Sequence, residues 1–411
     1  MTATALQQEE HLPEAIVCKW CGKSFHYLKS HISMGRCENI PESAKGLDVD
    51  EVVKMYTSAF PDEPTISRTA LAKLNEKRAE KHSSEGKVAE ISAHPGYAGT
   101  VEYKTELVAA HELLGVTIKE LGTPRGKPLQ VTVNVNTPYP EFVPEAKKNY
   151  VYGDFDLIKD IFMMLEIGIP GYLWGHAGTG KSSLPTQLCA LLNRPLIRAQ
   201  HTASMEEAHV TGQILARDGS TYFEPGLLAL AMKNGWVYLA DEYDFAFPQI
   251  LGVYQPVLEG EPLIIKEATP DWRRITPHKR FAFIGTGNTN GSGDETGLYQ
   301  GTNIQNAANF SRFGIVSNVK YMSTKAEVNM LAEAGVIREY AEKMVKFANL
   351  VREGYEQHLI SQPIGPRELL LSAKIGMMRG DFSAGIEKSF INKLPSTSAQ
   401  AAREVVQKIF G

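Results

Sequence analysis

Short apolar runs alternate with helical stretches through the middle of the chain, from about residue 145 to 320. Three runs, Pro195–Arg198, Trp236–Ala240 and Phe281–Gly285, have the length and composition of buried strands. A fourth, within Ile167–Trp174, reads as a strand in its later half. Alternation of this kind predicts βαβ units and a parallel sheet with helices on both faces. We therefore expect an α/β fold here.

The pattern changes beyond Lys325, where the strand signals stop. Apolar positions then recur at helical spacing. They predict helices over 325–336, 339–353, 367–378 and about 397–410. A small α-helical domain is thus expected after the α/β core.

The first third of the chain is less regular. Leu129–Asn136 alternates between apolar and polar positions, which is typical of a half-buried strand. Leu107–Leu121 and Ser67–Ser83 are rich in helix formers and predict two helices. We interpret the basic run Lys77–Lys81 within the latter as a solvated face.

A phosphate-binding loop follows the first predicted strand of the α/β part. The stretch Gly175–Ser182 fits the pattern G-x-x-x-x-G-K-[ST] in every position. Glycines let successive backbone N–H groups turn inward, Lys181 adds positive charge, and the Ser182 hydroxyl can ligate Mg²⁺. The helix predicted after it adds its dipole. The expected nucleotide-binding residues are Gly175, His176, Ala177, Gly178, Thr179, Gly180, Lys181, Ser182 and Ser183.

Polar residues end two of the predicted strands. Asp241 and Glu242 follow Trp236–Ala240, and Asn288 lies just beyond Phe281–Gly285. At the carboxyl edge of a parallel sheet, Asp241 is expected to hold Mg²⁺ and Glu242 to polarise a water for attack on the γ-phosphate. Asn288 is expected to orient that water; its alternative role is to form a turn.

Two arginines complete the candidate set. Arg312 follows a helical stretch at the end of the α/β part, and Arg367 opens a helix of the C-terminal part. In a ring, the first would reach a neighbouring subunit's γ-phosphate, and the second would approach the phosphates from the lid.

These motifs, in this order, resemble an AAA+ ATPase of the MoxR group. Phe223–Leu228 is similar to an element that precedes the acidic strand in that group, and Gly212–Tyr222 is similar to its inserted hairpin. The chain is most similar to the CobS-like group, which includes the small ATPase subunit of cobaltochelatase and proteins of tailed phages. The similarity covers about 140–411. It is carried by the runs Asp241–Asp244, Gln255–Glu259, Pro277–His278, Gly285–Thr302 and Phe390–Lys393.

The resemblance implies a hexameric ring with ATP and Mg²⁺ bound between subunits. It assigns Mg²⁺ to Ser182 and Asp241, catalysis to Glu242, sensor 1 to Asn288, the arginine finger to Arg312 and sensor 2 to Arg367. It also implies a partner protein that carries a von Willebrand A domain. An extra cysteine cluster at the N-terminus departs from the chelatase subunit.

That cluster begins like a zinc finger. Cys18 and Cys21 form a C-x₂-C knuckle. Nine residues separate Cys21 from His31, and fifteen separate Cys21 from Cys37. These four would make a closed structural zinc site, with His26 as the competing third ligand. Cysteines without metal are the other alternative. Lys19, Lys23, Lys29 and Arg36 make the segment basic, which allows contact with nucleic acid; docking to a protein is the interpretation we favour.

Composition narrows the class of protein. Three of the four cysteines lie in this cluster, which favours a metal over disulfides. A net charge of −4 argues against general coating of nucleic acid, and the N-terminus shows no signal peptide. We expect a cytoplasmic protein, or one in the host cytoplasm if it is phage-encoded. The expected domains are 14–40 (zinc-finger-like), 41–139 (connector), 140–322 (α/β) and 323–411 (helical lid).

Three functions remain open from the sequence. The first is a ring motor that remodels a partner protein. The second is a nucleic-acid-binding ATPase recruited by the zinc finger, and the third is the ATPase subunit of a cobalt chelatase.

Overall fold

The computed structural model describes residues 13–33, 36–45, 47–61, 63–70, 101–217 and 219–411. The chain divides into two compact units, Met1–Ile91 and Ser92–Gly411. Most of the predicted helix Ser67–Ser83, with the basic run Lys77–Lys81, lies outside the described residues.

The first unit is a small α/β module around the cysteines. Strand β1 (Ile16–Val17) pairs with β2 (Ser24–Phe25), and α2 (Leu28–Ser33) follows. Helix α3 (Val49–Ala59), which begins at the N-cap Asp48, packs against α2. Its buried Val52 and Tyr56 share one core with residues of β1, β2 and α2. The finger-like segment therefore folds together with the sequence after it.

The second unit is built on the predicted parallel sheet. Five parallel strands lie in the order β13-β5-β12-β9-β6. Four of them match the predicted runs, so the α/β fold is confirmed. The fifth, β13, is short and half exposed at the sheet edge, so its apolar signal is weak. The strands are β5 (Gly171–Trp174), β6 (Leu196–Gln200), β9 (Val237–Asp241), β12 (Ala282–Gly287) and β13 (Ile315–Asn318).

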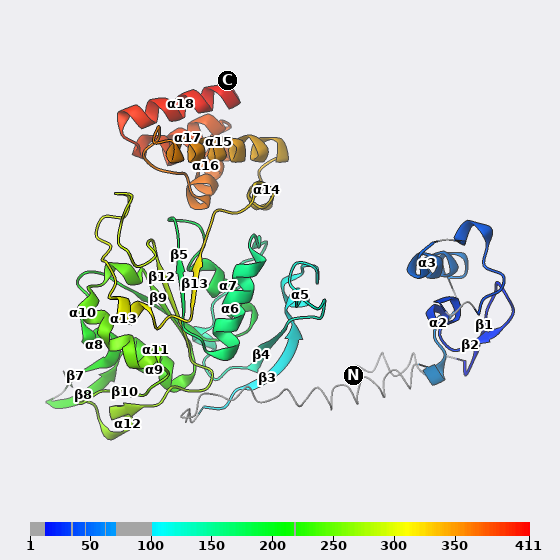
Figure 1. Ribbon diagram of the computed structural model, residues 1–411, viewed down its shortest axis with the longest axis horizontal. Helices are drawn as coiled ribbons and strands as arrows, with labels where there is room; N and C mark the ends of the chain where they lie inside the picture. The colour runs from blue at the N-terminus through cyan, green and yellow to red at the C-terminus, as the bar shows by residue number, and fades with distance from the viewer. Residues whose placement is uncertain (1–12, 34–35, 46, 62, 71–100, 218) are drawn as a thin grey trace. The chain divides into compact units, whose positions relative to one another are not determined.

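Helices cover both faces of this sheet, as Figure 1 shows. Adjacent residues of one strand enter different cores. Tyr172 packs with α9 (Leu227–Asn234) on one face, whereas Leu173 packs with α6 (Phe155–Ile167) and α7 (Ser183–Leu191) on the other. Cys189 of α7 is fully buried as a small apolar side chain.

Further short elements follow β9 on the first of these faces. They are η3 (Tyr243–Phe245), α10 (Pro248–Leu251), η4 (Gly252–Tyr254), α11 (Gln255–Leu258), β10 (Leu263–Ile264), α12 (Pro270–Arg273), β11 (Arg274–Ile275) and α13 (Ala307–Phe310).

Two antiparallel hairpins flank the sheet. One pairs β3 (Lys104–Ala109) with β4 (Gln130–Asn136), so the predicted strand is confirmed and the predicted helix 107–121 is mostly wrong. Pairing with β4 overrides helix propensity up to Ala109, and only α5 (Ala110–Leu114) is helical before Gly115 ends it in a left-handed conformation.

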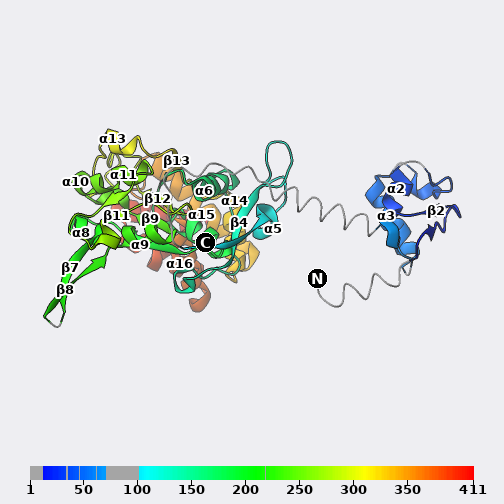
Figure 2. The ribbon, with the colours of Figure 1, turned by 90° about the horizontal axis from the view of Figure 1, so that it is seen from below.

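The second hairpin, β7 (Gly212–Arg217) with β8 (Ser220–Pro225), follows α8 (Glu207–Thr211). It is the hairpin that the resemblance implied for Gly212–Tyr222. In Figure 2 it projects from the body of the unit.

The C-terminal part is the predicted helical domain, or lid. Its elements are α14 (Thr324–Glu333), α15 (Arg338–Glu356), α16 (Pro366–Arg379), α17 (Phe382–Ser389), η5 (Ile391–Lys393) and α18 (Ser396–Phe410). The four predicted helices are confirmed, whereas α17 was not predicted. Its Gly385 would place a Cβ 2.2 Å from the Ser372 carbonyl oxygen, so α17 packs on α16 through backbone rather than a large apolar stripe. Within the described ranges, we find no helix with the length and apolar character needed to span a bilayer.

Candidate functional site

The phosphate-binding loop joins β5 to α7 at the carboxyl edge of the sheet. Gly175, Gly178 and Gly180 have φ of 146°, 80° and 103°, which side chains with a Cβ rarely adopt. At Gly175 a Cβ would also lie 2.5 Å from the carbonyl oxygen of Val319. The loop lines a cavity of about 910 Å³ that it shares with the sheet edge and the lid.

Lys181 is folded over this loop. Its Nζ donates to the carbonyl oxygens of Gly175 (2.7 Å) and His176 (2.9 Å) and to Oδ1 of Asn288 (3.1 Å). Burial lowers the pKa of Lys181 to about 8, although the nearby carboxylates Asp244 and Asp241 oppose this effect. The loop lysine and the predicted sensor asparagine are therefore in direct contact.

Asp241 is surrounded by donors. Its Oδ1 accepts the hydroxyls of Ser182 and Thr286, and its Oδ2 accepts Nε of Arg198 at 2.7 Å. Burial raises the pKa of Asp241, but these hydroxyls and the Arg198 charge outweigh it and lower the pKa overall. The carboxylate is thus held ionised beside the Ser182 hydroxyl, which is the donor set that Mg²⁺ prefers.

Glu242 stands next to it in an unusual backbone conformation. Its φ is 52°, in the left-handed region, and its N–H donates to Oγ1 of Thr286 at 3.3 Å. The side chain accepts a hydrogen bond from Gln200. Burial raises the pKa of Glu242, and the charges of Asp241 and Asp244 raise it further. Such a carboxylate is a stronger base for a proton from water.

Asn288 is fixed by its backbone as well as by Lys181. Its N–H donates to Oδ2 of the buried Asp244 at 2.8 Å, and Thr289 donates its N–H and hydroxyl to the same oxygen at 3.0 Å. Burial raises the pKa of Asp244 despite these bonds. Asp244 therefore shapes the strand end at which Asn288 meets the loop.

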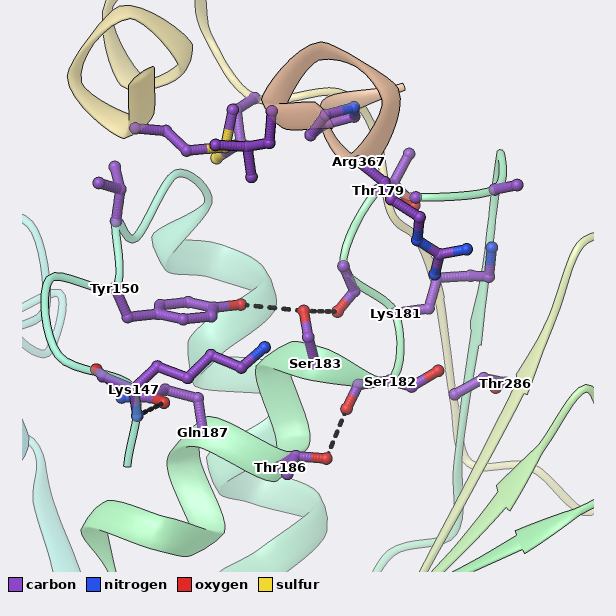
Figure 3. Close-up of a pocket in the computed structure, with 18 of the residues that line it drawn as sticks. Lys147, Tyr150, Thr179, Lys181, Ser182, Ser183, Thr186, Gln187, Thr286 and Arg367 are labelled. Carbon is purple, nitrogen blue, oxygen red and sulfur yellow. Dashed lines mark hydrogen bonds between the residues drawn. The ribbon is translucent and has the colours of Figure 1, made fainter. Parts of the chain in front are cut away.

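The lid closes the cavity from the side opposite the sheet edge. Arg367 opens α16, lines the cavity and extends toward the loop near Thr179 and Lys181, as Figure 3 shows. Apolar side chains of the lid and its connection, Met322, Met330 and Leu370, also line it.

Arg312 lies elsewhere. It follows α13 and does not line the cavity. Its Nε donates to Oε1 of Glu259 at 2.8 Å, and its guanidinium also donates to the carbonyl oxygen of Ala308. Within one chain, the structure brings the other predicted site residues together around the loop and leaves Arg312 apart.

Several residues at the cavity were not predicted from the sequence. Arg198 and Gln200 project from β6 onto the two acids, and Tyr150 lies with its hydroxyl 3.3 Å from Oγ of Ser183 (Figure 3). Thr286 sits one residue before the end of β12. A polar residue at or next to the carboxyl end of β6 and β12 was the available signal for Gln200 and Thr286.

The four predicted zinc ligands come together in the first unit. Their ligand atoms all lie within 4.8 Å of one another. The sulfurs of Cys18 and Cys37 are 3.8 Å apart, and Sγ of Cys21 is 3.3 Å from Nε2 of His31. Tetrahedral zinc places two thiolate sulfurs about 3.8 Å apart, so the donor set fits this ion. His26 instead lies 3.0 Å from Oγ of Ser67.

Comparison with known proteins agrees with this geometry. The model of the AAA domain of the dynein-related subfamily matches residues 172–302. The aerobic cobaltochelatase subunit CobS of Sinorhizobium sp is 32% identical over 249 residues, which span 58% of this chain and 74% of that protein. The chain belongs to the CobS-type AAA+ ATPases. An uncharacterized protein of Staphylococcus aureus is 23% identical over 62% of this chain and 96% of its own length.

Among solved structures, the RuvB Holliday junction branch migration motor of Thermotoga maritima is 13% identical and gives a TM-score of 0.38. That comparison covers 65% of this chain and 72% of RuvB.

As a CobS-type AAA+ protein, the chain is an ATPase that uses ATP and Mg²⁺.

Proposed function

We propose that this CobS-type ATPase works as a hexameric ring, as its family resemblance implies, and that the ring remodels a partner protein.

 The observation that carries the proposal is the separation of Arg312 from a cavity that otherwise gathers the loop, both acids and Arg367. An arginine that does not line its own chain's cavity can supply charge to a neighbouring copy's site. In this proposal the hydrolysis site is completed only between two copies.

Each residue has a role within such a site. The loop N–H groups and Lys181 bind the phosphates, and Ser182 with Asp241 would hold Mg²⁺, which neutralises phosphate charge when bound. Glu242 takes the proton of the attacking water, and Asn288 orients that water. Arg367 binds phosphate from the lid.

Mixing two inactive variants tests completion in trans. Glu242→Gln and Arg312→Ala should each reduce ATP hydrolysis at least about 100-fold. If sites form between copies, mixed rings contain some interfaces with an intact Glu242 facing an intact Arg312. The mixture should then regain part of the wild-type rate. A mixture as inactive as its components, although co-purification of separately tagged variants shows mixed rings, would contradict the proposal.

The partner is proposed to be a protein with a von Willebrand A domain. Support comes from the family resemblance, since CobS is named as one subunit of a chelatase. Capture with the Glu242→Gln variant in ATP should retain this partner, and Lys181→Ala, which loses a phosphate contact and should bind ATP more weakly, is the matched control. A cobalt chelatase role is the second candidate, and it predicts ATP-dependent cobalt insertion when the other chelatase subunits are added.

We propose that the first unit binds structural zinc through Cys18, Cys21, His31 and Cys37 and docks a protein. Zinc would supply folding energy to a core this small. The nucleic-acid alternative is less favoured because three of the predicted basic residues are paired with carboxylates. These ion pairs are Lys19 with Glu63, Lys23 with Glu38 and Lys29 with Asp50. Stimulation of hydrolysis by DNA or RNA, lost on Cys18→Ser, would instead support the alternative.

A further inference from the structure

Three tyrosines surround the ring of His176, the second residue of the phosphate-binding loop. The hydroxyl of Tyr299 lies 2.8 Å from Nδ1 of His176 and accepts the N–H of Ala177 at 3.2 Å. The ring of Tyr321 stacks on the imidazole, with 5.7 Å between centroids and 4° between planes. Tyr355 meets it edge-on at 5.8 Å and 89°.

These tyrosines come from three different parts of the unit. Tyr299 lies in the loop between β12 and α13, beyond Asn288. Tyr321 lies between β13 and α14, in the connection from the α/β part to the lid, and Tyr355 belongs to α15 of the lid itself. One side chain of the loop therefore contacts the sensor loop, the connection and the lid.

A second set of contacts leads from Tyr321 to the start of α16. The guanidinium of Arg352 lies 4.0 Å from the centre of the Tyr321 ring. Two 2.8 Å hydrogen bonds fix it to the fully buried carboxylate of Glu327. Its Nε donates to the carbonyl oxygen of Ile364 at 3.0 Å. Ile364 stands shortly before Arg367, so Arg352 supports the backbone from which Arg367 extends.

The start of α16 also touches the loop directly. A Cβ on Gly365 would lie 2.8 Å from the carbonyl oxygen of Ala177, and one on Gly178 would lie 3.4 Å from Cβ of Arg367. Such close approach leaves the lid little room to shift without displacing the loop.

We propose that His176 is a positioning residue that couples the lid to the phosphate-binding loop and, through Tyr321 and Arg352, holds Arg367 over the phosphates. The proposal rests on the proposed function, in which Arg367 binds phosphate. Burial and the charge of Lys181 lower the pKa of His176. Its ring is therefore uncharged at pH 7 and stacks on Tyr321 as a neutral aromatic ring.

A double-mutant cycle tests the coupling. The dissociation constant of ATP is measured in the Glu242→Gln background for His176→Ala, Arg367→Ala and both together. Each single change should weaken binding about tenfold, and the double variant should be little weaker than either. A double variant about 100-fold weaker would show independent effects and overturn the coupling alone. An Arg367→Ala variant with unchanged affinity would overturn both the coupling and the proposed role of Arg367.

Two further variants separate stacking from loss of folding. His176→Phe keeps an aromatic ring on Tyr321. Its loss of ATP affinity should therefore be at most half of the loss seen in His176→Ala. If it binds ATP as weakly as His176→Ala, the stacking proposal is wrong. Tyr340→Leu is the matched control, because Tyr340 stacks on Phe382 within the lid and makes none of these contacts. It should leave ATP affinity unchanged, and thermal unfolding of each variant checks that the fold is intact.

Discussion

Lys181 is held by oxygens that ATP must replace. Its Nζ is bound to two loop carbonyls and Asn288, and burial brings its pKa down to about 8. The polyphosphate of ATP is negatively charged, whereas these oxygens are neutral. ATP binding should therefore stabilise the charged form of Lys181 and raise its pKa again.

This predicts a proton linked to ATP binding. Below pH 8, Lys181 is charged in the free protein and binding takes up no proton at this group. Above pH 8, the free lysine is increasingly neutral, so binding takes up a proton and affinity falls by about tenfold per pH unit. Calorimetry at pH 7 and pH 9, in buffers of different ionisation enthalpy, measures this uptake. Lys181→Gln should show none at pH 9, and equal uptake in that variant would assign the proton to another group.

Arg198 gives a second prediction at the residue scale. Its side chain is 56% exposed and pairs with Oδ2 of Asp241, so it competes with the water shell of Mg²⁺ for that oxygen. Asp241 is buried, but the Arg198 partner is solvent-screened, so the pair contributes on the order of 1 kcal/mol, which is about a fivefold change in affinity. Arg198→Ala should therefore lower the Mg²⁺ concentration needed for half-maximal binding of a fluorescent ATP analogue by about twofold to fivefold. Arg198→Lys, which keeps the charge, should change it less, and a higher Mg²⁺ requirement in Arg198→Ala would contradict the competition.

The sequence was informative about residues only where a motif has a fixed spacing. Lys181, Ser182 and the two acids could be found because the loop and the acidic strand end have recognisable patterns. Arg198 and Tyr299 had no such pattern, since their contacts depend on how β6 and a long loop are placed in space.

At the scale of elements, the junction between the loop and α16 depends on one glycine. Gly365→Ala would place a methyl group 2.8 Å from the Ala177 carbonyl oxygen. Backbone on both sides must then move apart, which should weaken ATP binding about tenfold and lower the thermal unfolding midpoint. Gly252→Ala is the control, because nothing lies within 4 Å of its added Cβ. Equal effects of the two substitutions would show that the close contact is unimportant.

Helices and strands could be predicted from the sequence where the pattern of apolar residues alone decides the local structure. The core strands β5, β9 and β12 are buried on both faces, and β6 is buried at Leu196 and Ile197, so all four contain apolar runs. The stretch around β3 was misread because its pairing with β4 is a tertiary interaction that overrides local helix propensity.

At the scale of the whole molecule, the two units should respond separately to loss of metal. The described cores of the two units are separate clusters, and none of the described residues of the first unit lines the cavity. Cys18→Ser should remove bound zinc and unfold the first unit, measured by elemental analysis and by hydrogen exchange of α3. ATP affinity of the second unit should change less than about twofold. A large loss of ATP affinity would show that the first unit supports the nucleotide site.

The left-handed backbone at Glu242 has a consequence for how such chains diverge. A residue with a Cβ is disfavoured there by about 1–2 kcal/mol, and the neighbouring carboxylates add repulsion. In the proposed function, the need for a base at this point keeps a glutamate in place. A descendant that binds ATP without cleaving it is released from that need and gains stability from glycine or asparagine. Either residue at this position of a related sequence would therefore mark a member of the family that has stopped hydrolysing ATP.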